Sequence, residues 1–306
     1  MMPKNKLSVI WNITDRCPYE CSFCCMDAGP ATKGGEMSLE QKLRTVKELG
    51  RVNCRVDLSG GEVMFNKKDH LPVIELLSHT LGRESVGLSC SGAFINDSTA
   101  RRLSGLVGDV EITMDAHPNQ DYRYRPAAYH LTAAKAGVLF KRWGISVGVQ
   151  TVVTKEHMCL SLLREIYWWI CDNRIDAWSI LKFFPSGRGQ CYPELELSDP
   201  ECRKIVAYVH DLDAANHDPH KPKCDIHYLM PGTEKENVCR CVKKSVGILP
   251  DGRVTACFWG LGAQGSLKHD KFLLGNITRQ SFDEILSGEN ARFWQEYCGE
   301  CYLACA

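Results

Sequence analysis

The sequence predicts an α/β fold built on a parallel sheet, and two observations support this prediction. Strand-like and helix-like segments alternate through residues 7–184 of the 306-residue chain, and six strands joined by helices imply parallel pairing with right-handed crossovers. The segment 147–153 is apolar almost throughout, as expected for a strand that is buried on both faces. A barrel and an open doubly wound sheet both fit this pattern, so the periodicity alone leaves the two open.

Local signals place each element of this core. The first strand (7–13) is rich in β-branched and apolar residues. The first helix begins after Ser38, which is spaced to form a capping box with Gln41, and it ends at Gly50. The second strand (55–58) runs into a pair of glycines. The later strands are expected at 85–90, 109–115, 145–153 and 177–184, and the later helices at 70–81, 97–107, 128–143, 160–172 and 199–213.

The C-terminal third has a different composition. Residues 216–237 are rich in His, Lys and Pro, which is typical of a linker. Beyond them, 245–248 and 253–258 flank a Pro-Asp-Gly turn and predict a β-hairpin. Ser281 and Glu284 are spaced to cap a short helix. We therefore expect a small hairpin and helix domain after the main sheet.

Charge and cysteine content exclude several classes of protein. Lys+Arg and Asp+Glu both total 37, so the zero net charge argues against a nucleic-acid partner. No apolar run approaches the roughly 20 residues that a membrane span needs, and no signal-peptide pattern opens the chain. The 17 cysteines are an odd number. The composition favours a cytoplasmic protein, without a membrane partner, whose thiols stay reduced or bind metal.

The strongest motif is a C-x3-C-x2-C run just after the first strand, formed by Cys17, Cys21 and Cys24. Three thiolates on one loop can hold three irons of a 4Fe–4S cube and leave the fourth iron open for a ligand. Two alternatives remain at this point. The thiols are ordinary buried cysteines, or they hold zinc with Cys25 as a fourth ligand.

This motif resembles the cluster loop of the radical SAM superfamily, including the aromatic residue, Phe23, before the last cysteine. A second feature of that superfamily stands at the end of the second predicted strand, in the run Ser59, Gly60, Gly61 and Glu62. Family members usually read Gly-Gly-Glu-Pro, and Val63 replaces the proline here. Glycines at this point let the backbone approach the methionyl group of S-adenosylmethionine (SAM).

The resemblance implies a partial (β/α)6 TIM-like barrel over residues 1–210. Cys17, Cys21 and Cys24 would bind a 4Fe–4S cluster whose open iron chelates SAM. One-electron reduction, from a flavodoxin or ferredoxin type of donor, would cleave SAM to a 5′-deoxyadenosyl radical that abstracts hydrogen from the substrate. The cofactor would supply the difficult chemistry, and the protein would orient it.

Polar residues at the C-terminal ends of strands are the remaining site candidates, because a β/α barrel places its site there. Asp115 and Arg188 are the catalytic candidates; the Arg188 fork is suited to a SAM or substrate carboxylate. The candidates for cofactor binding are Phe23, Ser59, Gly60, Gly61, Glu62, Ser89 and Gln150. An ordinary core or loop role is the alternative for each polar residue at a strand end.

The C-terminal cysteines resemble a second feature of the same enzymes, the SPASM/twitch extension that binds auxiliary iron–sulfur clusters. Cys239 and Cys257 fit the spacing C-x12-G-x4-C across the predicted hairpin, and Cys298 and Cys301 follow. A full SPASM reads C-x2-C-x5-C-x3-C, and the x5 block is missing, which favours a twitch domain with one auxiliary cluster. Those four cysteines are the expected ligands, with Cys241 and Cys305 as substitutes, and a four-cysteine zinc ribbon is the alternative.

These inferences divide the chain into a radical SAM core (1–210), a linker (211–238) and an auxiliary-cluster domain (239–306). The substrate would lie between core and auxiliary domain. Strand one begins near residue 7, which leaves no room for a peptide-recognition domain before the barrel. We therefore expect a small polar substrate, similar to an aminocyclitol or aminoglycoside, that is dehydrogenated or epimerised. The alternatives are a maturase of ribosomally made peptides, a non-catalytic metal-binding module and a nucleic-acid-modifying enzyme.

Overall fold

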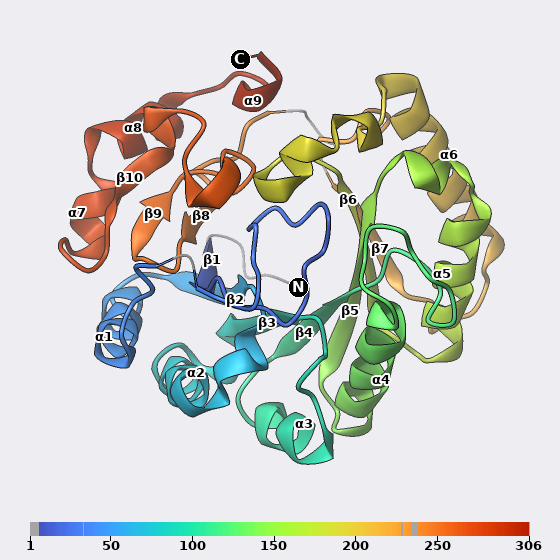
Figure 1. Cartoon of the computed structure of the whole chain (residues 1–306), viewed down its shortest axis with the longest axis horizontal. Coiled ribbons are helices and arrows are strands. Elements are labelled where there is room, and N and C mark those ends of the chain that lie inside the picture. The colour runs from blue at the N-terminus through green and yellow to red at the C-terminus, as the bar shows by residue number, and fades with distance from the viewer. Residues whose placement is uncertain (1–5, 33, 228, 234–237, 306) are drawn as a thin grey trace.

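The computed structural model describes residues 6–32, 34–227, 229–233 and 238–305 (Figure 1). Its strands are β1 (Leu7–Thr14), β2 (Cys54–Gly60), β3 (Val86–Cys90), β4 (Asp109–Thr113), β5 (Ser146–Val153), β6 (Ala177–Lys182), β7 (Lys223–Ile226), β8 (Ser245–Ile248), β9 (Arg253–Thr255) and β10 (Leu273–Asn276). Its α-helices are α1 (Leu39–Leu49), α2 (Lys67–Leu81), α3 (Asp97–Ser104), α4 (Tyr129–Arg142), α5 (Ser161–Asp172), α6 (Asp199–Ala215), α7 (Phe282–Leu286), α8 (Glu289–Glu296) and α9 (Tyr302–Cys305).

The first six strands form a partial barrel. They pair in parallel and in sequence order, β1-β2-β3-β4-β5-β6. A doubly wound sheet would reverse its strand order at a switch point, and this sheet does not. Figure 1 shows the strands curving around a centre with α1 to α6 outside them. The barrel is therefore confirmed, and the open sheet that the periodicity also allowed is wrong.

Most element boundaries agree with the predictions within a few residues. The capping box of α1 is present, since the Ser38 hydroxyl accepts a hydrogen bond from the Gln41 amide and the Gln41 side chain accepts one from the Ser38 amide. Strand β9 ends three residues earlier than expected, at Thr255. The Thr255 hydroxyl accepts a hydrogen bond from the Cys257 amide, which turns the chain out of the sheet.

The region predicted as a linker contains secondary structure in its described part. Helix α6 extends to Ala215, and β7 pairs in parallel with β6. Lys223 and Asp225 of β7 are exposed and Ile226 is buried. The polar composition that indicates a linker is thus that of an edge strand with few apolar residues.

The C-terminal hairpin continues the barrel sheet. Strand β8 pairs in parallel with β1, from Ser8 opposite Ser245 to Trp11 opposite Ile248. Strands β9 and β10 then add in antiparallel orientation. Gly252 in the hairpin turn has a φ of 84°, which favours glycine. The whole order is β10-β9-β8-β1-β2-β3-β4-β5-β6-β7, so the hairpin is an extension of the sheet at the β1 edge.

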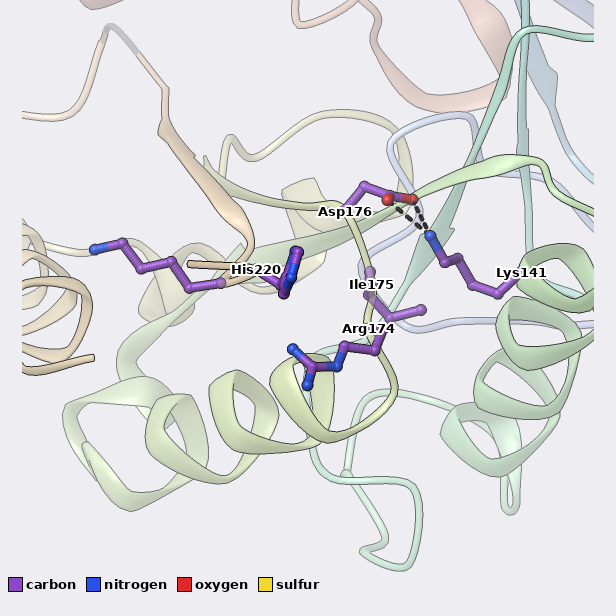
Figure 2. Close-up of a pocket in the computed structure, with 6 residues that line it drawn as sticks. Lys141, Arg174, Ile175, Asp176 and His220 are labelled. Carbon is purple, nitrogen blue, oxygen red and sulfur yellow. Dashed lines mark hydrogen bonds and ion pairs between the residues drawn. The ribbon is translucent and has the colours of Figure 1, made fainter. Parts of the chain in front are cut away.

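Ion pairs fix the amino-terminal end of the barrel, around a surface hollow (Figure 2). Lys141 of α4 donates to both carboxylate oxygens of Asp176, at 2.7 and 2.8 Å. Asp176 also accepts a hydrogen bond of 2.7 Å from the Val147 amide. Arg174 pairs with Asp218 at 2.8 Å. This end of a β/α barrel serves stability. Across the described residues, none of the helices has both the length and the apolar content to span a bilayer.

A buried polar cluster fastens the segment that leads from the loop after β1 into α1. The carboxylate of Glu36 accepts hydrogen bonds from Lys42 at 2.6 Å and from Thr14 at 2.7 Å. Lys42 is 2% exposed and also contacts the His70 ring at 3.0 Å. Burial opposes ionisation of Glu36, but the nearby His70 ring, the hydrogen bonds from Lys42 and Thr14 and the charge of Lys42 outweigh it and lower the pKa of Glu36 to about 2.

Glu36→Gln is expected to lower the free energy of unfolding by about 3 kcal/mol, because Lys42 keeps its buried charge without a carboxylate. The lowered pKa of Glu36 means that its stabilisation is present above pH 4.5 and is lost as the pH falls toward 2. Anaerobic thermal unfolding measures both effects. Glu40→Gln, at an exposed position of α1, is the control, and equal stability of the two variants would contradict this account.

Candidate functional site

The cysteine loop (15–32) follows β1 and lies inside the curve of strands, as the blue loop at the centre of Figure 1. Cys17 and Cys21 are buried, and Cys24 is half-buried. The loop closes on itself through hydrogen bonds from the Cys17 amide to the Gly29 carbonyl at 2.7 Å and from the Asp27 amide to the Cys24 carbonyl at 3.0 Å. The structure thus brings the three motif cysteines together at the C-terminal end of β1.

The charge environment of these thiols suits a bound cationic cluster. Burial raises the pKa of Cys17 to about 12, and the Cys24 and Cys21 thiolates raise it further. Burial also raises the pKa of Cys21, where Arg125 acts in the opposite direction. Three thiolates so close together disfavour ionisation until iron neutralises them. The loop therefore fits a 4Fe–4S cluster bound through three cysteines.

The glycine pair joins the end of β2 to the start of the cysteine loop. The Gly61 amide donates to the Thr14 carbonyl and the Glu62 amide to the Arg16 carbonyl, both at 2.8 Å. A Cβ on Gly60 would lie 2.4 Å from the Thr14 oxygen, and one on Gly61 would lie 2.2 Å from the Arg16 oxygen. Both positions require glycine because two backbone segments touch here, whatever cofactor binds above them.

Glu62 is fully buried and its carboxylate holds the neighbouring strand end. It accepts hydrogen bonds from the Met64 amide at 3.0 Å and from the amide and hydroxyl of Ser91. Val63, which replaces the expected proline, is completely buried in the core. Glu62 thus positions the ends of β2 and β3, and Ser59 precedes it opposite Asn12 of β1.

Arg188 links the cysteine loop to the far side of the barrel. Its Nε donates to the Cys21 carbonyl and its Nη1 to Asp27, both at 3.0 Å. Asp27 accepts a further hydrogen bond from the Gln264 amide in the C-terminal domain. Within the described residues, Nη2 of Arg188 is buried and has no hydrogen-bond partner. That free donor is suited to a carboxylate on a bound ligand.

Asp115 lies beyond the end of β4 and is fully buried against Arg125. Its carboxylate accepts hydrogen bonds from Arg125 Nε at 2.6 Å and from the Val152 amide at 2.9 Å. The Arg125 guanidinium covers the ring of Phe23, with its carbon 4.6 Å from the ring centroid. Phe23 itself is buried among aromatic rings. Asp115 therefore acts on the site through Arg125.

Gln150 and Ser89 belong to the inner face of the barrel. The Gln150 amide donates to the Glu111 carboxylate, and Ser89 lies opposite Glu111 in the pairing of β3 with β4. Burial raises the pKa of Glu111 to about 7, and the Asp57 and Asp109 carboxylates add to this effect. The inner face thus carries a carboxyl group that titrates near neutral pH.

A cavity of about 560 Å³ separates this inner face from the C-terminal domain. Polar side chains from successive strands line the barrel side: Glu111, Gln150, Ser179 and Asp225. Four cysteines line the opposite side: Cys239, Cys241, Cys257 and Cys301. The volume is in the range of sites for small ligands and cofactors.

Three cysteines of the C-terminal domain, Cys239, Cys241 and Cys257, line the same cavity and interact electrostatically. The Cys239 amide donates a hydrogen bond of 3.0 Å to the carbonyl of Gly299, the residue after Cys298. The Cys298 thiol is exposed and donates to the Glu296 carbonyl. Cys301 lines the cavity with the three, and the Cys305 side chain lies outside the described part of the structure.

The described side chains of His, Cys, Asp and Glu include no group of three placed to hold a single metal ion. The ligands of an iron–sulfur cluster lie farther apart than those of a single ion, because each thiolate binds a different iron. Thiols that surround a common space are therefore suited to a cluster even where they are not placed to hold one ion.

The comparisons with known proteins begin with the C-terminal domain. The SPASM family of iron–sulfur cluster-binding domains matches residues 239–305. Fe-coproporphyrin III synthase of Methanosarcina barkeri is 24% identical over 295 residues, which cover 90% of this chain and 72% of that protein. Pre-heme d1 synthase of Dinoroseobacter shibae is 29% identical over 184 residues, which cover 59% of this chain and 44% of that relative's length.

Two solved structures share the fold. The anSMEcpe protein with bound AdoMet and a Kp18Cys peptide has a TM-score of 0.73 at 17% identity, over 95% of this chain and 83% of that one. BtrN in complex with AdoMet and 2-DOIA has a TM-score of 0.52 at 13% identity, over 100% of this chain and 92% of that one. The residues that match the SPASM family follow the partial barrel in the chain. These findings support a radical SAM fold with a C-terminal SPASM domain.

The SPASM match indicates an iron–sulfur cluster in the C-terminal domain, and the solved structures of the same fold contain AdoMet. One residue beside the cysteine loop, Arg125, carries no sequence signal, because it lies in the loop after β4 and belongs to no motif. Cys241, which the sequence offers as a substitute ligand, lines the cavity together with Cys239 and Cys257.

Cys241→Ala should remove iron from the auxiliary site, by up to about four atoms per chain, while Cys298→Ala should leave the iron content unchanged. Cys241 lines the cavity with Cys239, Cys257 and Cys301, and the Cys298 side chain is exposed. Iron counting after anaerobic reconstitution measures the difference. Iron loss from the Cys298 variant, with none from the Cys241 variant, would show that our ligand set is wrong.

Proposed function

We propose that this enzyme dehydrogenates a small polar substrate held in the cavity between the barrel and the auxiliary cysteines. When bound, SAM and the catalytic cluster supply a 5′-deoxyadenosyl radical that abstracts hydrogen, and an auxiliary cluster supplies an electron acceptor. Cys17, Cys21 and Cys24 would hold the first cluster, and Cys239, Cys241, Cys257 and Cys301 the second. The location of the cavity beside these four thiols carries the proposal.

The lining of the cavity favours a substrate with hydroxyl or amino groups, similar to an aminocyclitol or amino sugar. Gln150, Ser179 and Asp225 come from three neighbouring strands and offer hydrogen bonds from one side. Trp259 packs against Phe184 and His227 at the open edge of the barrel, with ring centroids 4.8 Å apart in each pair. The site thus combines polar groups for orientation with aromatic walls that exclude water.

Dehydrogenation is favoured over epimerisation by the cysteines around the cavity. Epimerisation needs a thiol that returns a hydrogen atom to the substrate. Among the described residues that line the cavity, every cysteine belongs to the auxiliary set. Conversion of an alcohol to a ketone requires loss of a hydrogen atom, an electron and the hydroxyl proton. Glu111, whose pKa is raised to about 7 by burial and by Asp57 and Asp109, is suited to accept that proton.

A peptide substrate is the second candidate. The anSMEcpe structure that shares this fold contains a bound peptide, and one side chain of a peptide could enter the same cavity. The chemistry at the cavity would be the same, with the remainder of the peptide outside it.

Reconstituted enzyme with SAM, a reductant and an aminocyclitol should form 5′-deoxyadenosine, and Cys24→Ala should not, because it lacks one cluster ligand. A substrate with deuterium at the reacting carbon should transfer it to 5′-deoxyadenosine, and product formed in D2O should carry no deuterium at that carbon. Solvent deuterium in the product would indicate epimerisation. Turnover of peptides, without turnover of aminocyclitols, would favour the second candidate. If the unaltered protein formed no more 5′-deoxyadenosine than Cys24→Ala, the protein would be a non-catalytic metal-binding module.

Glu111→Gln should lower product formation by about 10²-fold, because it removes the proton acceptor. Cleavage of SAM should continue, so the ratio of product to 5′-deoxyadenosine should fall. In the unaltered enzyme this ratio should rise as the pH passes about 7, where Glu111 ionises. Glu194→Gln, at an exposed position outside the cavity, is the control. A ratio that is unchanged in Glu111→Gln would remove Glu111 from the reaction.

A further inference from the structure

Arg125 places a buried positive charge beside the catalytic cysteines. Its side chain is 10% exposed and donates from Nε to Asp115 at 2.6 Å. The guanidinium lies between two aromatic rings, with its carbon 4.6 Å from the Phe23 centroid and 4.9 Å from the Tyr129 centroid. The residue before Arg125 is held to the cysteine loop, since the Ser22 amide donates to the Tyr124 carbonyl at 3.1 Å. A guanidinium stays charged in such a site, so a fixed positive charge lies beside the cysteine loop.

The surrounding elements fix this geometry. Asp115 is fully buried and is held by the Val152 amide of β5 at 2.9 Å. The Asp115 carbonyl accepts a further hydrogen bond from the buried His157 ring at 2.9 Å. The orientation of Arg125 is therefore set by the ends of β4 and β5, which belong to the rigid part of the barrel.

The two charges contact different groups. The Arg125 guanidinium covers the ring of Phe23, which belongs to the cysteine loop, and Asp115 binds Nε of the guanidinium. The positive charge is therefore the member of the pair that packs on the cysteine loop.

We infer that Arg125 raises the reduction potential of the catalytic cluster and that Asp115 limits this effect. Reduction adds one negative charge to the cluster and its thiolates. A positive charge beside the cluster stabilises that reduced state. The pair would therefore set how readily the electron donor reduces the cluster, separately from any contact with substrate.

The test is an anaerobic redox titration of the reconstituted enzyme, with the reduced clusters detected by EPR. The catalytic cluster is the one whose EPR signal changes when SAM is added. Arg125→Gln should lower the ratio of reduced to oxidised cluster about tenfold at a given potential, which is a shift of about 59 mV to more negative values for one electron. Arg123→Gln is the control. Arg123 is exposed and lies 5.5 Å from the Tyr124 ring, and its substitution should leave the titration unchanged.

A second variant, Asp115→Asn, distinguishes an electrostatic effect on the cluster from damage to the fold. It keeps the size of the side chain but removes the negative charge, so the cluster should become easier to reduce, opposite to the effect of Arg125→Gln. Shifts of opposite sign support the inference, and a role limited to packing would not produce them. If Arg125→Gln fails to bind iron, the sign for Asp115→Asn decides alone. No shift in either variant, or a shift of Asp115→Asn to more negative potential, would overturn the inference.

Discussion

The parallel pairing of β8 with β1 is the constraint on which the rest of the site depends. It joins the C-terminal hairpin to the strand that leads into the cysteine loop, with Ser8 opposite Ser245 and Trp11 opposite Ile248. Cys239 and Cys241 lie just before β8 and Cys257 lies just after β9, and these three line the cavity with Cys301. The catalytic cysteines follow β1 itself. One short ladder of backbone hydrogen bonds thus relates the positions of the two cysteine groups.

The cysteine loop is held from several directions, as a reactive site requires. The glycine pair holds it to β2, Arg188 to the far side of the barrel, and Glu36 to α1 and α2. Arg125 adds a charge that is itself oriented by Asp115. These contacts are hydrogen bonds to backbone carbonyls and charged side chains, and they fix the orientation of the loop more closely than apolar packing would. The same contacts leave one donor of Arg188 free for a ligand.

The sequence was sufficient for a parallel sheet with its helices, because alternation of elements and cap residues such as Ser38 and Gln41 are local signals. The choice of a barrel came from the resemblance of the cysteine loop to the radical SAM superfamily. The three catalytic cysteines share one loop, so they too were found from a local signal. The hairpin was predicted, but its pairing with β1 was not, since register between distant strands has no local signal. Strand β7 was missed because its polar residues are those of an edge strand. The sequence predicts Cys298 as an auxiliary ligand with Cys241 as a substitute, and the structure places Cys241 in the lining of the cavity. Asp115 was predicted from its place at a strand end, but its partner, Arg125, carries no motif.

The central claim is that this chain holds two iron–sulfur sites, one in the loop after β1 and one in the C-terminal domain that β8 joins to β1. Anomalous diffraction from an anaerobic crystal of the reconstituted enzyme, recorded at the iron and zinc edges, tests it most directly. We predict iron density within Cys17, Cys21 and Cys24, and a second iron peak within Cys239, Cys241, Cys257 and Cys301, with no zinc in either. A zinc peak at the second group, or iron bound outside the cavity by Cys298, would contradict this account.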